Sequence, residues 1–266
     1  MNKETTLCIS IAEKPGEFGA QFHNAGYRML GLNYVYLPRK VFPIELGAVV
    51  QSIRTLRIRG CSVSMPHKEG VMQYLDVIDS NAAQIGAVNT VVNQQGTLTG
   101  YNTDYDGAKK VLEGRVWGKS VLLVGAGGVA KAIGVAAKEL GADITVTNRS
   151  PEQGKNLAVL LHAAFIPWEQ KENVSGDVLI NATSIGMGDK ALAAPPSLIG
   201  NHKMIYDAVL GETPLLAEAR AQGKQIIPGL VMCVHQAAAQ FLLYTGRQAP
   251  EELVTRTIEE EERKWK

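Results

Sequence analysis

Short apolar runs alternate with longer amphipathic stretches along this chain, a pattern that indicates strands alternating with helices. In the first sixty residues it predicts strand, helix, strand, helix and strand, over residues 5–11, 18–30, 33–37, 44–56 and 58–63. Such a β-α-β-α-β order favours a mostly parallel sheet that is covered by helices.

A second alternating system begins at Val121 and continues toward the end of the chain. It predicts strands at 121–124, 144–147, 178–181, 205–209 and 225–227, and an Ala-rich helix that runs to Leu140. Further helices are expected at 156–161, 214–222, 230–244 and 250–263. Two systems of this kind predict two α/β domains with a cleft between them, where small-molecule sites tend to form.

The stretch that joins the two systems carries polar residues of interest. Residues 85–93 are predicted to form a strand and residues 97–101 the second strand of a hairpin, leading to a helix that begins near Tyr105. Asp104, just before that helix, fits a capping role and a catalytic role equally well. Pro66 is expected to end the third strand and start a short helix, which places Lys68 near a helix N-terminus. The helix dipole disfavours a cation at that position, so Lys68 has no stabilising role there. Taken by itself, a lysine is nevertheless more often a surface residue than a catalytic one.

The strand at 121–124 leads into a glycine-rich turn of the form G-x-G-x-x-A. The turn consists of Gly125, Ala126, Gly127, Gly128, Val129 and Ala130. Gly125 permits the tight turn, Gly127 lets the backbone approach a pyrophosphate, and the small Ala130 lets the helix pack on the strand. The first N–H groups of that helix then face the phosphates. Because a second strand follows at the right distance, the sequence predicts a dinucleotide-binding β-α-β unit.

The end of that second strand bears on the choice of nucleotide. An NAD site usually has an Asp or Glu there, whereas this chain has Asn148, Arg149 and Ser150. The guanidinium of Arg149 suits a 2′-phosphate, and no carboxylate is present to repel one. The charge pattern therefore favours NADP over NAD. The alternative that Arg149 is only a solvated residue at a strand end, and that NAD is the cofactor, stays open.

Composition narrows the class of protein. The chain has 266 residues, 45% of them hydrophobic, and 27 Lys and Arg against 26 Asp and Glu. This balance gives no indication of nucleic-acid or membrane binding. The 3 cysteines fit neither a disulfide framework nor a metal motif, so no metal site is expected and a reducing cytoplasm is the expected location. No signal peptide or membrane span is predicted, and the expected protein is soluble and intracellular.

Several motifs in combination resemble the shikimate/quinate dehydrogenase family. They are V-S-M-P-H-K, G-A-V-N-T, Y-N-T-D-Y-D-G, G-A-G-G-V-A, N-R-S, N-A-T-S-I-G-M and H-Q-A-A-A-Q-F. Their order and spacing match over essentially the whole chain, and the resemblance is greatest to the branch of shikimate dehydrogenase-like proteins. It implies an N-terminal α/β substrate domain, residues 1–104 completed by helices in 235–266, and a Rossmann-type dinucleotide-binding domain, residues 105–234.

The resemblance also implies roles for single residues. Lys68 and Asp104 correspond to the catalytic pair, and a positioned base is what the oxidation of a secondary alcohol requires. The substrate, a cyclic hydroxy acid, would be bound by Ser64, Asn89, Thr103 and Gln236. The cofactor would be held by the 125–130 turn, by Asn148, Arg149 and Ser150, and by Thr183 and Gly229. A monomer and a homodimer are both compatible with the family.

Three departures from the family pattern bear on the substrate. The biosynthetic enzymes bind the substrate carboxylate with paired serines, where this chain has Glu17 and Gly19. Leu210 replaces a usual tyrosine, and Gln153 replaces a frequent second arginine. Three functions therefore stay open: an NADP-preferring dehydrogenase of shikimate, quinate or a close relative, a dehydrogenase of a different cyclic polyol, and a dinucleotide-binding regulatory module without catalysis.

Overall fold

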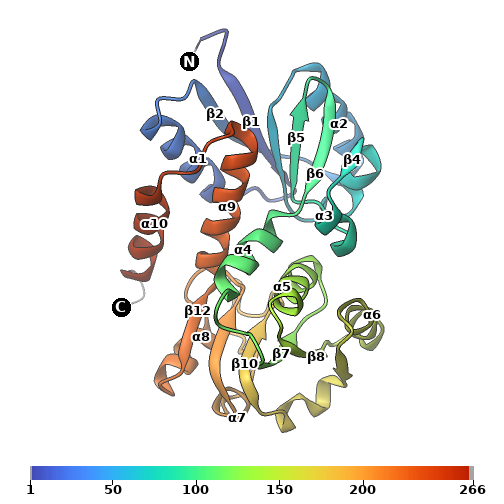
Figure 1. Ribbon diagram of the computed structural model, residues 1–266, viewed down its shortest axis with the longest axis vertical. Coiled ribbons are helices and arrows are strands. Elements are labelled where there is room, and N and C mark those ends of the chain that lie inside the picture. The colour runs from blue at the N-terminus through green and yellow to red at the C-terminus, as the bar shows by residue number, and fades with distance from the viewer. Residues whose placement is uncertain (1, 264–266) are drawn as a thin grey trace. The chain divides into compact units, whose positions relative to one another are not determined.

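The two alternating systems of the sequence form two separate sheets, each with its own helices, in a computed structural model that describes residues 2–263 (Figure 1). One unit comprises the chain up to Thr103 together with Gln236–Thr257. The other comprises Asp104–His235 and the residues from Ile258 onward. The predicted α/β class with two domains is confirmed by this division and by the two sheets.

The first unit contains a six-stranded sheet in the order β2-β1-β3-β5-β6-β4. Its strands are β1 (Thr6–Ala12), β2 (Tyr34–Lys40), β3 (Gly60–Val63), β4 (Val77–Ile78), β5 (Thr90–Gln94) and β6 (Thr97–Tyr101). Its helices are α1 (Phe18–Met29), α2 (Leu46–Thr55) and α3 (Ser80–Ile85), with short 3-10 helices at Pro43–Glu45 and Gly70–Tyr74. β1 pairs in parallel with β2 and β3, while β5 is antiparallel to β3 and β6.

Successive residues of a strand face opposite sides of the sheet, and on both sides of this sheet they pack against helices. Ile9 and Ile11 of β1 pack in a cluster with residues of α2 such as Ile53. Cys8, next to Ile9 in the strand, belongs to a second cluster with the aromatic side chains of α1 and of the C-terminal part of helix α9 (Gly229–Thr245), including Phe241. The strand pattern therefore fixes which helix covers which face.

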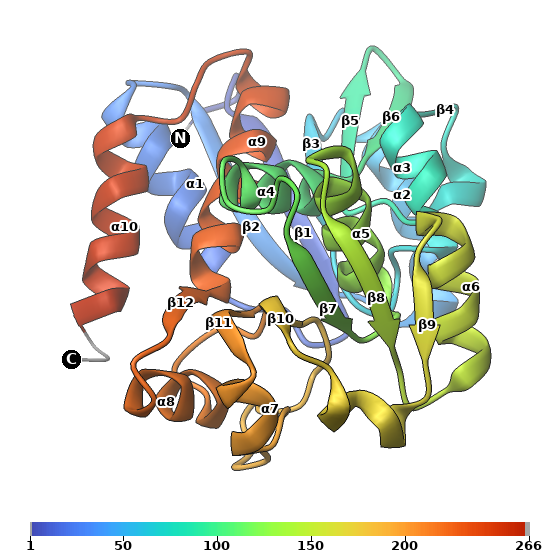
Figure 2. The ribbon, with the colours of Figure 1, turned by 60° about the horizontal axis from the view of Figure 1, so that its bottom comes forward.

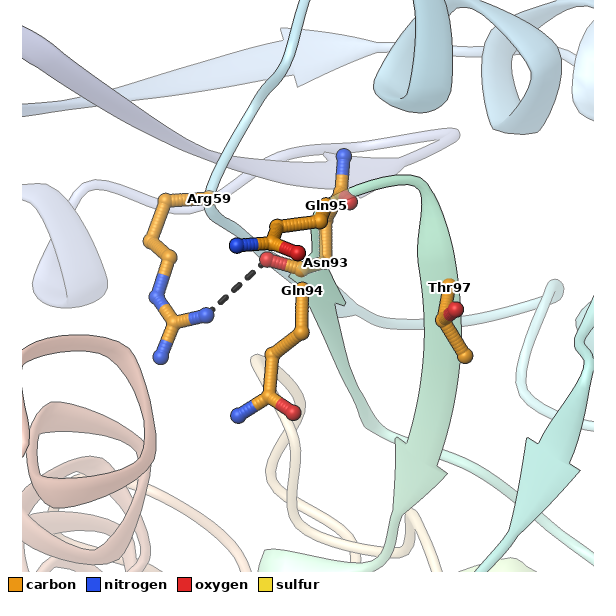
Figure 3. Close-up of a pocket in the computed structure, with 5 residues that line it drawn as sticks. All are labelled: Arg59, Asn93, Gln94, Gln95 and Thr97. Carbon is orange, nitrogen blue, oxygen red and sulfur yellow. Dashed lines mark hydrogen bonds between the residues drawn. The ribbon is translucent and has the colours of Figure 1, made fainter.

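Arg59 fixes the C-terminal end of α9 to the sheet. Its guanidinium donates to the carbonyl oxygens of Leu243 at 3.2 Å and Tyr244 at 2.9 Å, and to that of Asn93 at 2.9 Å. A cation at the last turn of a helix satisfies free carbonyls and interacts favourably with the dipole. Figure 3 shows Arg59 beside the hairpin residues around Asn93, where they line an open groove of about 600 Å³.

Two predictions of local structure in the first unit were wrong. Residues 85–89 do not continue the strand, because α3 ends at Ile85 and β5 begins only at Thr90. The Asp79 side chain accepts a hydrogen bond from Asn81 N at 3.0 Å, and Gly86 ends the helix at a φ of 72°. No helix begins at Pro66 either, since residues 65–69 form turns and the next 3-10 helix begins at Gly70.

The second unit contains a fully parallel sheet in the order β12-β11-β10-β7-β8-β9. Its strands are β7 (Ser120–Val124), β8 (Asp143–Thr147), β9 (Ala164–Ile166), β10 (Gly176–Asn181), β11 (His202–Asp207) and β12 (Gln225–Pro228). Its helices are α5 (Gly128–Glu139), α6 (Pro151–Leu161), α7 (Pro196–Gly200) and α8 (Pro214–Ala221), with a 3-10 helix at Trp168–Asn173. This strand order is that of a doubly wound dinucleotide-binding fold, with β7 at the point where the order reverses.

The helices of the second unit lie along its sheet (Figure 2). α5 and α6 contact β7, β8 and β9, while α7 and α8 contact β11 and β12. The strands are buried nearly throughout, which explains their continuous apolar sequences. Three helices carry residues of both units, namely α4 (Thr103–Leu112), α9 and α10 (Glu251–Arg263).

Candidate functional site

A buried polar network lies at the end of the β5–β6 hairpin in the first unit. The side-chain oxygen of Asn89 accepts hydrogen bonds from Thr103 N at 2.7 Å, Thr103 Oγ1 at 3.0 Å and Thr90 Oγ1 at 2.7 Å. Gln236 Nε2 donates to Thr103 Oγ1 at 3.2 Å. Three of the predicted substrate residues, Asn89, Thr103 and Gln236, are therefore brought together. All three of these bonds to the Asn89 side chain use its oxygen, which leaves its amide group to donate to a ligand.

A cavity of about 140 Å³ adjoins this network at the carboxyl ends of β1 and β3. Its polar lining consists of Ser10, Tyr36, Ser62, Ser64, Gln236 and Gln240. Burial raises the pKa of Tyr36, and hydrogen bonding of its hydroxyl to Ser10 and Ser62 partly offsets that effect. The cavity thus contains Ser64, the fourth predicted substrate residue, among several neutral hydrogen-bonding groups.

Gln240 is the main residue of this site that sequence reasoning missed. Its Nε2 donates to Thr90 Oγ1 at 2.8 Å and to Ser62 Oγ at 3.1 Å, and the side chain is 2% exposed. Its oxygen lies 3.4 Å from Nε2 of His23, whose pKa is lowered to about 4 by burial. A signal was present, because Gln236 and Gln240 are four residues apart and therefore share one face of a helix.

Lys68 lies in the turn that follows β3, half-buried. Its backbone carbonyl accepts a hydrogen bond from Val88 N at 2.8 Å, which holds it close to the chain segment that carries Asn89. The neighbouring His67 is buried, and its Nε2 lies 2.9 Å from the carbonyl oxygen of Val41. His67 is therefore a structural residue, and Lys68 is the titratable group of the V-S-M-P-H-K motif that stays accessible.

Asp104 is buried in the first turn of α4, which begins at Thr103 rather than near Tyr105. Asp104 lies inside the helix, so it is not the capping residue. The residue that precedes the helix is Asn102, whose Nδ2 donates a hydrogen bond to Ala87 O at 2.9 Å. Within the second unit, burial raises the pKa of Tyr206 well above its ordinary value, and the charge of Asp104 adds to this rise.

The glycine turn of the second unit has the geometry that its sequence predicts. Gly125 has a φ of 119°, and a Cβ on it would lie 2.8 Å from the carbonyl oxygen of Ala182. Ala126 and Ala130 are buried, and Ala130 lies in the first turn of α5 on the buried side of that helix. A Cβ on Gly127 or Gly128 would meet no described atom within 4 Å. Packing therefore does not require these two glycines, and the space above them is open at a helix N-terminus, as a pyrophosphate would need.

The residues after β8 lie at the start of α6. Arg149 is exposed, and Asn148 Nδ2 donates to Ser150 O at 3.0 Å. Ser150 precedes Pro151, the first helical residue, and its side chain makes no capping hydrogen bond. A hydroxyl and a guanidinium are thus available beside a helix N-terminus, which is a site that favours an anion.

Thr183 and Gly229, also predicted for the cofactor, lie at the carboxyl edge of the same sheet. Thr183 N and Oγ1 both donate to the side-chain oxygen of Asn181, at 3.1 and 2.7 Å. Gly229 begins α9 directly after β12. Ligands of open α/β sheets bind at this edge, so these two residues lie at the edge where a nucleotide binds in folds of this kind.

No cluster of three or more His, Cys, Asp or Glu side chains within residues 2–263 is arranged to hold a metal ion. None of the helices in this part of the chain is both long and apolar enough to span a membrane.

Comparison with known proteins gives matches over nearly the whole chain. The family model of the shikimate dehydrogenase substrate binding domain matches residues 18–91, and that of the shikimate 5'-dehydrogenase C-terminal domain matches residues 229–259. A shikimate dehydrogenase-like protein of Haemophilus influenzae is 41% identical, over 96% of this chain and 96% of its own. A shikimate dehydrogenase (NADP(+)) of Moorella thermoacetica is 38% identical, over 97% of this chain and 94% of its own.

A solved structure matches equally far along the chain. Shikimate 5-dehydrogenase from Thermus thermophilus, in complex with NADP(H) and shikimate, has a TM-score of 0.86 at 28% identity. The match covers 96% of this chain and 99% of that chain. The glycine turn and the polar network thus lie within a fold that in this relative holds both a dinucleotide and a cyclic hydroxy acid.

Proposed function

The chain belongs to the shikimate dehydrogenase family, and on that premise we propose that it transfers hydride between NADP(H) and a ring hydroxyl or ketone of shikimate, quinate or a closely related cyclic polyol. For shikimate the reaction is shikimate + NADP⁺ = 3-dehydroshikimate + NADPH + H⁺. The observation that carries the proposal is the convergence of Ser64, Asn89, Thr103 and Gln236 on one cavity and its network. Hydroxyl and carboxamide groups are the partners that a polyol ring requires.

We assign substrate binding to residues 1–104 with the helices in 235–266, and dinucleotide binding to residues 105–234. When bound, the nicotinamide supplies the hydride chemistry. Lys68 takes the proton of the reacting hydroxyl as hydride leaves the same carbon, and returns it in the reverse direction. We assign the second catalytic role to Asp104, which corresponds to the carboxylate of the family's catalytic pair, and Asn89 and Gln236 donate hydrogen bonds to substrate oxygens.

NADP is the proposed cofactor. The backbone N–H groups of the 125–130 turn hold the pyrophosphate, and Arg149 with the hydroxyl of Ser150 binds the 2′-phosphate at the start of α6. Thr183 and Gly229 flank the nicotinamide end. Because Gln153 stands where a second arginine is frequent in the family, we expect NAD to be used as well, at lower efficiency.

A second candidate is the dehydrogenation of a cyclic polyol without a carboxylate. It is favoured by the exposed Glu17 and by Gly19, which stand in place of the paired carboxylate-binding serines, and by Leu210 in place of a tyrosine. Glu17 is not among the described residues that line the cavity, and none of these lining residues is a cation that would attract a carboxylate. Preference for a neutral ring over shikimate and quinate would select this candidate.

The proposed partners are accordingly a small cyclic hydroxy compound and NADP(H), without nucleic acid or membrane. We place the protein in the cytoplasm, as a monomer or homodimer.

The test is NADPH formation at 340 nm with shikimate and quinate, each against NADP and NAD, for the wild type and Lys68→Ala. Turnover that falls at least 100-fold in the variant, with NADP binding retained, is expected from removal of a general base. NADP binding without turnover on any polyol would favour the non-catalytic module. Absence of NADP binding would overturn the proposed function.

A further inference from the structure

Two buried polar residues join the neighbouring strands β10 and β11 at their carboxyl ends. Asn181 and Asp207 are register partners in the parallel ladder and are 1% and 0% exposed. Asn181 Nδ2 donates to Asp207 Oδ1 at 2.9 Å. Burial of a carboxylate is unfavourable unless its oxygens are hydrogen-bonded, so a residue of this kind at the end of an apolar strand needs an explanation.

Each of the two side chains also holds the loop that follows its own strand. The oxygen of Asn181 accepts both hydrogen bonds from Thr183, and Ile185 N in turn donates to Thr183 Oγ1 at 3.2 Å. Asp207 Oδ1 accepts a bond from Val209 N at 3.1 Å, and Oδ2 accepts one from Thr213 Oγ1 at 2.6 Å. Burial raises the pKa of Asp207, and these donors counteract it. A single chain of hydrogen bonds therefore fixes both loops.

The same two loops form the backbone surface against which the glycines of the nucleotide site pack. A Cβ on Gly125 would lie 2.8 Å from the carbonyl oxygen of Ala182. A Cβ on Gly229 would lie 2.5 Å from that of Val209. Displacement of either loop would therefore move the glycine turn or the start of α9, and with them the place of the dinucleotide.

We propose that Asp207 and Asn181 are positioning residues for dinucleotide binding. Through Thr183 and Val209 they hold the two loops in the arrangement that the cofactor requires, without touching the reacting atoms. This inference rests on the proposed NADP(H) dependence. A carboxylate suits the position because it accepts hydrogen bonds from three donors, Asn181 Nδ2 at the end of β10 and Val209 N and Thr213 Oγ1 in the loop after β11, which no apolar side chain could do.

The test compares Asn181→Asp with the exchanged double variant Asn181→Asp/Asp207→Asn. The single change keeps the acceptor for Thr183 but brings a second carboxylate to hydrogen-bond distance of Asp207, and the two repel. The exchange restores a donor opposite an acceptor. Asp177→Asn is the matched control, because Asp177 is a bonded carboxylate at the start of β10, on the opposite edge of the sheet, in contact with Ser120 and Lys203.

Dissociation constants of NADPH, measured by its fluorescence, are compared with the KM of the polyol and with Tm. We expect NADPH binding to weaken at least tenfold in Asn181→Asp, to recover at least threefold in the exchanged variant and to stay unchanged in the control, with the polyol KM within twofold throughout. Equal NADPH affinity in all variants of a wild type that binds it would overturn this inference alone. So would equal weakening of the polyol and NADPH, which indicates a general structural role. A wild type that binds no NADPH would overturn the proposed function as well.

Discussion

Replacement of Gly127 by alanine separates the needs of the protein fold from those of the cofactor. Gly127 has a φ of −77° and a ψ of −177°, which an alanine adopts without strain. The added Cβ would meet no described atom within 4 Å. The methyl group would instead project into the open space before α5, where we place the pyrophosphate. The folded protein should therefore tolerate the change, and the cofactor should not.

The expected magnitudes follow from these two facts. Alanine restricts the unfolded chain and stabilises the fold by about 0.4–1 kcal/mol. It is a poorer N-cap than glycine and loses roughly 0.5–1 kcal/mol there. These terms nearly cancel, so Tm should shift by no more than about 3 °C. A methyl group between backbone and phosphate prevents close approach, and an overpacked contact costs about 1–3 kcal/mol, or roughly fivefold to 160-fold in affinity.

Thermal unfolding with and without NADP measures both effects. At a concentration of about 100 times the wild-type Kd, NADP should stabilise the wild type by about 2.7 kcal/mol, and tenfold weaker binding should reduce this to about 1.4 kcal/mol. Gly125→Ala is the control, because its φ of 119° and its contact with Ala182 O require strain in the protein itself. It should lose about 2–5 kcal/mol of stability without any ligand. Unchanged NADP stabilisation of Gly127→Ala would refute the location of the pyrophosphate.

Three further outcomes are expected. The pKa of His23 is lowered from 6.5 to about 4 by burial in the folded protein, so as the pH falls the unfolded chain binds a proton before the folded protein does. The free energy of unfolding should therefore be fully retained above pH 6.5 and fall by up to about 3 kcal/mol toward pH 4. Urea unfolding of His23→Phe should show a shallower fall, and an identical slope would contradict this. Thr103→Val removes a fully buried hydroxyl that binds Asn89 and Gln236, and should raise the polyol KM about tenfold and cost about 1–3 kcal/mol of stability while NADP affinity stays constant. Arg149→Ala should lower the ratio of kcat/KM for NADP over NAD at least tenfold, and an unchanged ratio would show that the 2′-phosphate binds elsewhere.

Most of the fold could be predicted because its strands and helices are long enough for their periodicity to show. The strands at 121–124 and 178–181 and the helix at 214–222 appear in the structure within a few residues of their predicted ends. α3 was missed because its six residues are too few for an apolar repeat, and the run I-G-A-V-N-T-V-V looks like one strand. Its capping residues, Asp79 and Gly86, were the available signals.

The site was predictable where sequence motifs carry its chemistry, and not where contacts between distant segments create it. Asn89, Thr103 and Gln236 were expected together only through family resemblance, since they lie up to 147 positions apart (236 − 89) in the sequence. The link between Asn181 and Asp207 depends on the register of two parallel strands, which no local pattern specifies. Buried polar residues at the carboxyl ends of predicted strands are nevertheless visible in a sequence and indicate where to look.

The substrate pocket shows how a motif can be lost while its hydrogen-bonding capacity remains. The sequence shows only that Gly19 lacks a hydroxyl. In the structure, a Cβ at Gly19 would lie 3.2 Å from the hydroxyl oxygen of Tyr36, so the tyrosine already occupies the direction in which a serine would point. Tyr36 presents that hydroxyl beside Ser10 and Ser62 from other strands. Because the described residues that line this cavity carry no charged side chain, the pocket can hold ring hydroxyls through neutral hydrogen bonds. Hydroxyl groups of this kind can also donate to a carboxylate, as the paired serines of the biosynthetic enzymes do. The ratio of rates on neutral and acidic rings, rather than activity on shikimate alone, therefore decides the substrate.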